Sequence, residues 1–284
     1  MSKVLIGSVI WAPASQTPRA EVILKHFDCL KSILLEQSKI SDLLLIHNEC
    51  GIEEDTPDST EEGTHPLVLT GIEELVKLGA KVKYYSPQLG WTKGRNSILQ
   101  YFLLNRIYSH VAMTDCDQSF ANTSWVSKVL ELASVEPELH AYMIRPDKYQ
   151  KHADGELTGP SDGIVRPIDL YQEWLGTTNV LDRFAVDKVG GFDCRTFTNR
   201  WGFTDPEYGR RLRKAGVLKR TNGWYCDPIS IEGDHMDCPN YQDYLSSMKH
   251  KTMAFMAVYN SAVYYIENGK KDVWFDPCTD LPAH

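Results

Sequence analysis

The sequence predicts an α/β protein with an open, mostly parallel β-sheet that carries helices on both faces. Apolar runs of strand length alternate with stretches of helical periodicity through the first half of the 284 residues. This alternation favours parallel strands that are joined by helical crossovers. The composition, with 42% hydrophobic and 24% charged residues, is that of an ordinary globular protein.

The individual elements follow from the position of the apolar runs. The strands that we expect cover residues 4–12, 43–47, 80–86 and 110–115. The helices that we expect lie between them and cover residues 19–37, 70–78 and 93–107. In sheets of this kind ligands bind at the carboxyl ends of the strands, so the loops at those ends are where a site is expected.

Two polar segments and a C-terminal stretch complete the chain. Residues 53–66 are acidic and rich in turn formers, which predicts a surface excursion. Residues 147–167 are polar and rich in glycine and proline, and they form either a lid over a site or an ordinary excursion. After Asp237 the pattern becomes helical, which predicts a helical extension over residues 241–284 that packs on the same domain.

Charge and cysteine usage exclude several classes of protein. The formal net charge of −8 argues against broad, non-specific binding to nucleic acid, which needs an excess of lysine and arginine. Seven cysteines with no C-x-x-C pair indicate free thiols in a reducing compartment. The N-terminal segment lacks the long apolar core of a signal peptide, and no stretch approaches the roughly 20 apolar residues that span a bilayer. We therefore expect a cytoplasmic protein with no membrane span.

The most informative motif is Asp115-Cys116-Asp117, because it ends the apolar strand over residues 110–115. A turn at this point lets both carboxylates approach one hard cation. Mn²⁺ or Mg²⁺ that bridges a diphosphate suits such oxygen ligands. An isolated D-x-D triplet is most often a solvated turn, so the strand-end position carries the argument. His235 is a further candidate ligand, although a lone histidine is more often structural.

Two segments flank this motif in the sequence. G-W-T-K-G-R-N over residues 90–96 is a glycine-rich loop that opens a helix, where backbone N–H groups, Lys93 and Arg95 can bind an anion or a nucleotide. The alternative is a simple strand-to-helix turn. Downstream, Asp205 fits the N-cap of another helix, with Pro206 in its first turn. Asp205 is then either a capping carboxylate alone or a general base aimed at an acceptor hydroxyl.

Together these segments resemble the GT-A glycosyltransferases over roughly residues 1–236. The shared order is an N-terminal strand, G-x-x-x-x-R-N before a helix, D-x-D after a strand, R-x-x-x-x-x-V-G-G-F-D, a W-G-x-x-D helix start and a late histidine. The pattern is most similar to the inverting animal galactosyltransferases, with D-V-D and W-G-G-E-D motifs, and to the related bacterial family-two enzymes. The chain departs from the galactosyltransferases at Thr204, where they have an acidic residue that helps to hold the acceptor sugar.

The resemblance implies a GT-A domain over residues 1–240, with a nucleotide-sugar half over about 1–120 and an acceptor half over about 121–240. It implies a metal site for Mn²⁺ or Mg²⁺ whose ligands are Asp115, Asp117 and His235. The residues expected to contact the donor are Asn48, Trp91, Lys93, Arg95, Asn96 and Asp115. Asp205 is the expected inverting base, and the residues expected to contact the acceptor are Gly176, Trp201 and Gly202.

The implied reaction moves a sugar from a nucleoside diphosphate sugar, with UDP the expected nucleotide, to an acceptor hydroxyl with inversion. A retaining outcome stays open if Asp205 is only a helix cap. The acceptor is open among a glycan, a metabolite, a protein and hydroxymethylated phage DNA, although the acidic charge weighs against DNA. Two other functions remain as alternatives: a nucleotidyltransferase acting on sugar phosphates and an inactive sugar-binding GT-A module. A nucleotidyltransferase is expected to have a glycine-rich, lysine-containing loop where this chain has A-P-A-S-Q-T-P-R over residues 12–19.

Overall fold

A computed structural model describes most of the N-terminal half of the chain and a smaller part of the remainder. The described residues are 2–15, 17–48, 63–85, 90–120, 123–146, 178–193, 208–209, 211–212, 215–217 and 227–235. Residues 143–146 and 227–235 are described by their backbone alone.

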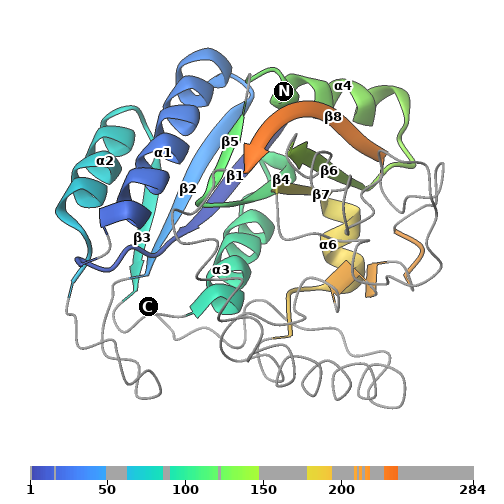
Figure 1. Cartoon of the computed structure of the whole chain (residues 1–284). Helices are drawn as coiled ribbons and strands as arrows, with labels where there is room; N and C mark the ends of the chain where they lie inside the picture. Colours follow the sequence, from blue (N-terminus) through green and yellow to red (C-terminus); the bar gives the residue numbers. More distant parts are fainter. Residues whose placement is uncertain are drawn as a thin grey trace, which may run out of the picture.

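The centre of the described structure is one eight-stranded sheet in the order β3-β2-β1-β4-β7-β6-β8-β5 (Figure 1). The strands are β1 (Lys3–Ile10), β2 (Ser41–Asn48), β3 (Lys81–Tyr85), β4 (Tyr108–Asp115), β5 (Gln118–Phe120), β6 (Ala141–Pro146), β7 (Thr178–Asp182) and β8 (Asp227–His235). β1 runs parallel to β2 and β4, β2 to β3, and β6 to β8. β7 runs antiparallel to both β4 and β6, and β5 runs antiparallel to β8. The predicted mostly parallel α/β sheet is therefore confirmed.

Helices cover both faces of this sheet (Figure 1). They are α1 (Thr17–Gln37), α2 (Pro66–Lys77), α3 (Gly90–Leu104), α4 (Trp125–Val135) and α6 (Arg183–Val189). Buried side chains of α1, α2 and α4 form one apolar core with the sheet, and those of α3 and α6 form a second core on the other face. Each helix thus buries one apolar face, which supplies most of the free energy that holds it on the sheet.

Two glycines let α3 lie unusually close to β1. A Cβ atom built on Gly7 of β1 would lie 2.3 Å from Ile98 of α3, and one built on Gly94 of α3 would lie 2.9 Å from Val9 of β1. Real Cβ atoms are not found at such distances, so both positions require glycine at this helix–strand spacing. The close packing fixes the first turns of α3 beside the carboxyl end of β1.

Arg183 secures the other end of α3. Its guanidinium donates hydrogen bonds to the carbonyl oxygens of Phe102, Leu103, Asn105 and Tyr108 at 3.0–3.3 Å. These carbonyls include ones left without a partner where the helix ends, and a cation at a helix C-terminus also interacts favourably with the helix dipole. The arginine that opens the R-x-x-x-x-x-V-G-G-F-D pattern is thus a helix cap.

The observed boundaries differ from the predicted ones in ways that have a physical reason. α3 begins at Gly90, three residues before the predicted start, so the whole G-W-T-K-G-R-N segment, predicted as a loop that opens a helix, lies inside α3. The close packing of Gly94 on Val9 outweighs the low helix propensity of glycine. α2 begins at Pro66, four residues before the predicted start, with the His65 side chain accepting a hydrogen bond from the Leu67 N–H.

Several predicted segments lie outside the described residues. They are most of the two polar segments over residues 53–66 and 147–167, and the helical extension over residues 241–284. The proposed division of the GT-A domain into two halves stays a prediction. Among the helices of the described ranges, none is both long enough and apolar enough to cross a membrane.

Candidate functional site

The Asp115-Cys116-Asp117 motif lies where the sequence analysis expects it, at the carboxyl end of a central parallel strand. Asp115 is the last residue of β4 and is paired in register with Val9 of β1. Cys116 and Asp117 form the turn that leads to β5. Both aspartates are partly exposed, whereas the cysteine between them is buried. The turn therefore places two carboxylates at the carboxyl ends of the parallel strands and buries the thiol between them.

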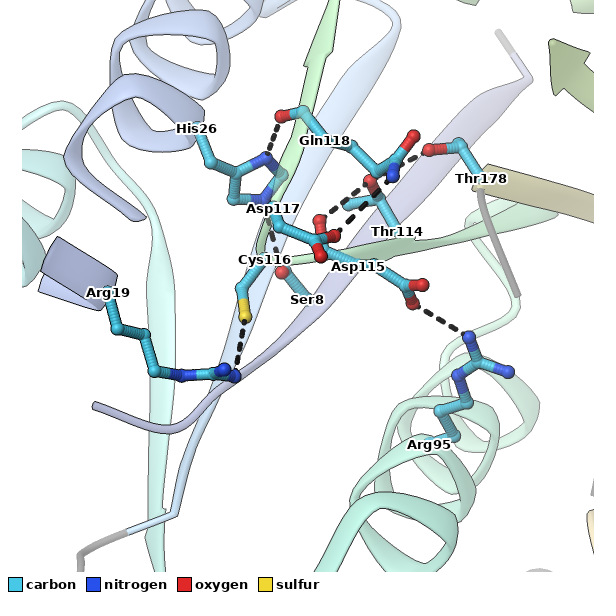
Figure 2. Close-up of polar contacts among 10 residues, drawn as sticks. All are labelled: Ser8, Arg19, His26, Arg95, Thr114, Asp115, Cys116, Asp117, Gln118 and Thr178. Atoms are coloured by element: carbon cyan, nitrogen blue, oxygen red, sulfur yellow. Dashed lines mark hydrogen bonds and ion pairs between the residues drawn. The ribbon is translucent and has the colours of Figure 1, made fainter. Parts of the chain in front are cut away.

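Arg95 of α3 holds the first carboxylate (Figure 2). Its Nη2 donates to Asp115 Oδ1 at 2.8 Å, and the side chains of Arg95 and Asp115 are 3% and 21% exposed. The guanidinium lies 4.5 Å from the ring centroid of Trp91 and 5.4 Å from that of Phe192. Arg95 is therefore a buried partner of the D-x-D motif, which differs from a contact at the edge of a nucleotide pocket.

Asn96, predicted to contact the donor, makes a different set of contacts. Its side-chain Nδ2 donates to the carbonyl oxygen of Phe192 at 2.9 Å, and its Oδ1 accepts from the N–H of Phe192 at 2.7 Å. The residue is 2% exposed. Because both ends of the amide are engaged with backbone, Asn96 holds the G-G-F-D segment against α3. Its contact with the donor stays a prediction.

The remaining predicted donor residues lie near the same sheet edge. Asn48 is the last residue of β2, and its Nδ2 donates to the carbonyl oxygen of Gly90, the first residue of α3, at 3.4 Å. Trp91 and Lys93 lie in the first turns of α3 and are partly buried. The structure thus brings the end of β2 and the start of α3 together. That these residues bind a nucleotide stays a prediction.

Arg19, in the first turns of α1, secures the middle of the motif. It lies 4.7 Å over the Trp11 ring, its Nε donates to the Trp11 carbonyl oxygen at 2.8 Å, and its Nη2 lies 3.9 Å from Cys116 Sγ (Figure 2). Burial raises the pKa of the Cys116 thiol to about 11. The thiol therefore stays protonated and packs as a small apolar group.

His26 of α1 secures the end of the motif. Its Nδ1 donates to the carbonyl oxygen of Gln118 at 2.6 Å, so its Nε2 accepts from the Ser8 hydroxyl, at 3.1 Å (Figure 2). The histidine is fully buried, and this burial lowers its pKa to about 4. Next to it, the Gln118 side chain donates to Asp117 Oδ1 at 3.4 Å.

The backbone register brings the last predicted metal ligand to the same place. β5 and β8 are antiparallel, with Gln118 opposite His235. The α-carbon of His235 is therefore paired with the residue directly after Asp117, although its side chain lies outside the description. Among the described side chains, no three His, Cys, Asp or Glu groups gather around one point.

The predicted acceptor side of the site lies outside the described residues. This applies to Gly176, Trp201, Gly202 and the candidate base Asp205. Residues that follow Asp205 are nevertheless tied to the G-G-F-D segment. Tyr208 stacks on Phe192 with ring centroids 4.2 Å apart, and Arg211 donates to the carbonyl oxygens of Val189 and Gly191.

Sequence reasoning missed two of the side chains that hold the motif, Arg19 and His26. Both lie on α1, which reads as an ordinary amphipathic helix. The available signal was His26 itself, a polar residue beside the buried positions Ile23 and Phe27 on the apolar face. Its partner on β5 cannot be inferred from that pattern, because the partner comes from a strand 92 residues away.

Comparison with known proteins supports the fold. No protein-family model and no curated protein matches this sequence. The structure is similar to the mannosyltransferase PcManGT from Pyrobaculum calidifontis in complex with GDP-Man and Mn²⁺, with a TM-score of 0.55 and 12% identity over 94% of this chain and 65% of that chain.

Two other structures of the same fold are also similar. Glucosyl-3-phosphoglycerate synthase from Mycobacterium tuberculosis, in complex with Mn²⁺, UDP and phosphoglyceric acid, gives a TM-score of 0.52 and 11% identity over 90% of this chain and 77% of that one. S. aureus TarS gives 0.53 and 12% identity over 94% of this chain and 40% of TarS. The chain thus spans less than two thirds of the mannosyltransferase and of TarS. These likenesses confirm the predicted GT-A fold.

Proposed function

We propose that this protein is a metal-dependent glycosyltransferase that moves a sugar from a nucleoside diphosphate sugar to an acceptor hydroxyl. The proposal rests on the Asp115-Cys116-Asp117 turn at the end of β4. Arg95 holds the Asp115 carboxylate, and the pairing of β5 with β8 places the backbone of His235 opposite Gln118, the residue after Asp117. In α/β sheets, ligands bind at the carboxyl ends of the strands, where this turn lies. The solved structures of the same fold include complexes with GDP-Man, UDP and Mn²⁺, which supports a nucleotide sugar and a divalent metal.

The residues at the turn fit a divalent cation of the hard type. Asp115 and Asp117 supply carboxylate oxygens at a partly exposed position, and a neutral imidazole from His235 suits Mn²⁺ as a further ligand. When bound, the metal would neutralise negative charge on the departing diphosphate. We propose these three residues as its ligands, with Mn²⁺ or Mg²⁺ as the ion.

The protein side of the reaction divides into binding and proton transfer. Asn48, Trp91 and Lys93 bind the donor, for which we propose UDP as the nucleotide, and Arg95 keeps the Asp115 carboxylate in place. Asp205 accepts the proton of the acceptor hydroxyl as that oxygen bonds to the anomeric carbon and the bond from that carbon to the diphosphate breaks. A single displacement of this kind inverts the configuration. Gly176, Trp201 and Gly202 are the proposed acceptor contacts.

The acceptor itself stays a prediction at the level of a hydroxyl compound. A DNA acceptor has no support in the described residues, and the net charge of −8 disfavours it. The cytoplasmic location inferred from the cysteines likewise stays a prediction.

The test is a donor panel in the presence of Mn²⁺. UDP-sugars and GDP-sugars are each incubated with the protein, and release of the nucleoside diphosphate and the shift in melting temperature are measured. We expect one donor to be hydrolysed slowly and to raise the melting temperature, and both effects to disappear in EDTA and in Asp117→Ala. Sugar 1-phosphates with UTP or GTP form a second arm, in which pyrophosphate release would favour a nucleotidyltransferase. Stabilisation by a donor without any turnover, even with a mixture of simple glycan acceptors, would favour an inactive binding module.

A further inference from the structure

β5 is the shortest of the described strands, and it lies beside the proposed metal site. It has three residues, it begins directly after Asp117, and it pairs along one edge with β8. In the described part of the sheet it is the last strand of the order, so no strand lies along its other edge. A pair this short is marginal by itself, and its position must be fixed by other contacts.

Side chains of α1 make those contacts. His26 Nδ1 donates to the carbonyl oxygen of Gln118 at 2.6 Å. One turn further along α1, Cys29 Sγ lies 3.5 Å from the N–H of Phe120 and 3.9 Å from its carbonyl oxygen. Helix α1 therefore hydrogen-bonds to backbone groups at both ends of β5.

The His26 contact is the more rigid of the two. The imidazole is completely buried and is fixed on its far side by the Ser8 hydroxyl of β1 (Figure 2). The Gln118 carbonyl oxygen can only accept a hydrogen bond, so the ring proton must lie on Nδ1. The lowered pKa supports a neutral ring at neutral pH. The imidazole then has one N–H, which bonds to β5, and one unprotonated nitrogen, which accepts from Ser8 of β1.

We propose that His26 is a positioning residue for the metal site, and that its Nδ1–H bond to Gln118 holds Asp117 beside the end of β8. This inference rests on the proposed function, since it takes Asp117 and His235 to share one ion. The bond acts on Gln118, which follows Asp117 directly in the chain and is paired with His235 in the register of β5 and β8. Hydrogen-bond partners that orient a metal ligand typically contribute about 10–100-fold to metal affinity.

Two amide substitutions separate this role from simple packing. In His26→Asn the amide nitrogen takes the place of Nδ1, so the donor to Gln118 is kept. In His26→Gln the amide nitrogen takes the place of Nε2, so the contact with Ser8 is kept and the donor to Gln118 is lost. We expect the Gln variant to bind Mn²⁺ about tenfold or more weakly and the Asn variant to stay within about threefold of the parent protein.

Mn²⁺ affinity is measured directly, by the electron paramagnetic resonance signal of free Mn²⁺ in titrations with and without UDP, and melting temperatures are recorded beside it. His110→Gln is the matched control, because His110 is another buried histidine, near the start of β4 and away from the turn. It should lower the melting temperature without changing Mn²⁺ affinity.

Three outcomes decide the matter. Weak binding in the Gln variant with near-normal binding in the Asn variant supports the inference. Equal affinities in both variants, or losses that follow melting temperature alone, overturn it while leaving the proposed function in place, provided that Asp117→Ala abolishes binding. If the parent protein binds no Mn²⁺, or if Asp117→Ala binds it normally, the proposed metal site itself is wrong and the inference falls with it.

Discussion

Arg95 is enclosed by two aromatic rings and one carboxylate, and this environment determines which properties of the protein its substitution should affect. A contact at the edge of a nucleotide pocket would contribute mostly to donor binding. A buried guanidinium that pairs with Asp115 at 2.8 Å also holds the fold around the site, since removing one partner leaves the other charge with less compensation. Stability and activity should therefore both respond.

We expect Arg95→Ala to lower the free energy of unfolding by about 2–4 kcal/mol, between the values for exposed and fully buried pairs. A double-mutant cycle with Asp115→Ala, followed by urea unfolding, should give a coupling of about 1–3 kcal/mol. The exposed pair of Lys31 and Glu74, with side chains 26% and 49% exposed, is the matched control and should couple much more weakly, because water screens the two charges. Equal coupling in the two pairs would contradict the buried role of Arg95.

At Asp205 the question is whether the carboxylate only caps a helix, by accepting a hydrogen bond from a backbone N–H, or also takes up the proton of the acceptor hydroxyl. Asparagine caps helices about as well as aspartate does but cannot take up a proton. We expect Asp205→Asn to keep the stability of the parent protein and to lose about a hundredfold or more in turnover. Product configuration, read by NMR, is the independent check: a retained anomeric centre would remove the single-displacement role.

At the scale of elements, the packing of α3 on β1 fixes where the site residues of α3 lie. Arg95 reaches Asp115 because α3 starts at Gly90 and lies close to β1 through Gly7 and Gly94. The helix is held at its far end by Arg183. A change of helix–strand spacing would therefore move Arg95 as well as the core.

Gly7→Ala tests this spacing. The added Cβ would meet Ile98 at 2.3 Å, so we expect a loss of about 1–3 kcal/mol in the free energy of unfolding, as for other overpacked cores. Ile98→Ala should cost about 2–5 kcal/mol alone. The double variant should be more stable than the sum of the two losses predicts, because the smaller side chain makes room for the new methyl group. Strict additivity in chemical denaturation would argue against the close approach.

The strands of the first half could be predicted from sequence because each carries its own apolar run, and the D-x-D motif could be placed because it ends one of them. The antiparallel strands could not. β7 pairs with β4, and β5 with β8, through residues far apart in the chain, and no local pattern encodes such pairings. The role of Asn96 was missed for the same reason, since its partner Phe192 is 96 residues away.

At the scale of the whole molecule, the parallel and mixed parts of the sheet meet at β4. The order β3-β2-β1-β4 is fully parallel, whereas β7, β6, β8 and β5 include both directions. The chain leaves β4, in the middle of the strand order, at Asp115. It passes through Cys116 and Asp117 and then enters β5, which is the last strand of the order. The D-x-D turn therefore joins the two parts, and contacts from α1 and α3 hold it in place.

Because His26 lies inside this junction, its protonation should affect the stability of the whole fold. Its pKa is about 4 in the folded protein and about 6.5 when the chain is unfolded, so between these values the unfolded state binds more protons and stability falls as the pH falls. The full difference corresponds to about 3 kcal/mol.

We therefore expect the free energy of unfolding, measured with urea in EDTA, to decrease by about 2–3 kcal/mol between pH 7 and pH 4.5 because of His26. Asp117 opposes this effect by raising the pKa, and His110, whose pKa burial also lowers, adds to the same acid sensitivity. His26→Asn cannot titrate, so its stability should depend less steeply on pH, whatever its absolute value. His110→Asn separates the second histidine in the same way. A His26→Asn variant that loses stability with acid as steeply as the parent protein would show that the imidazole is already able to take up a proton in the folded state.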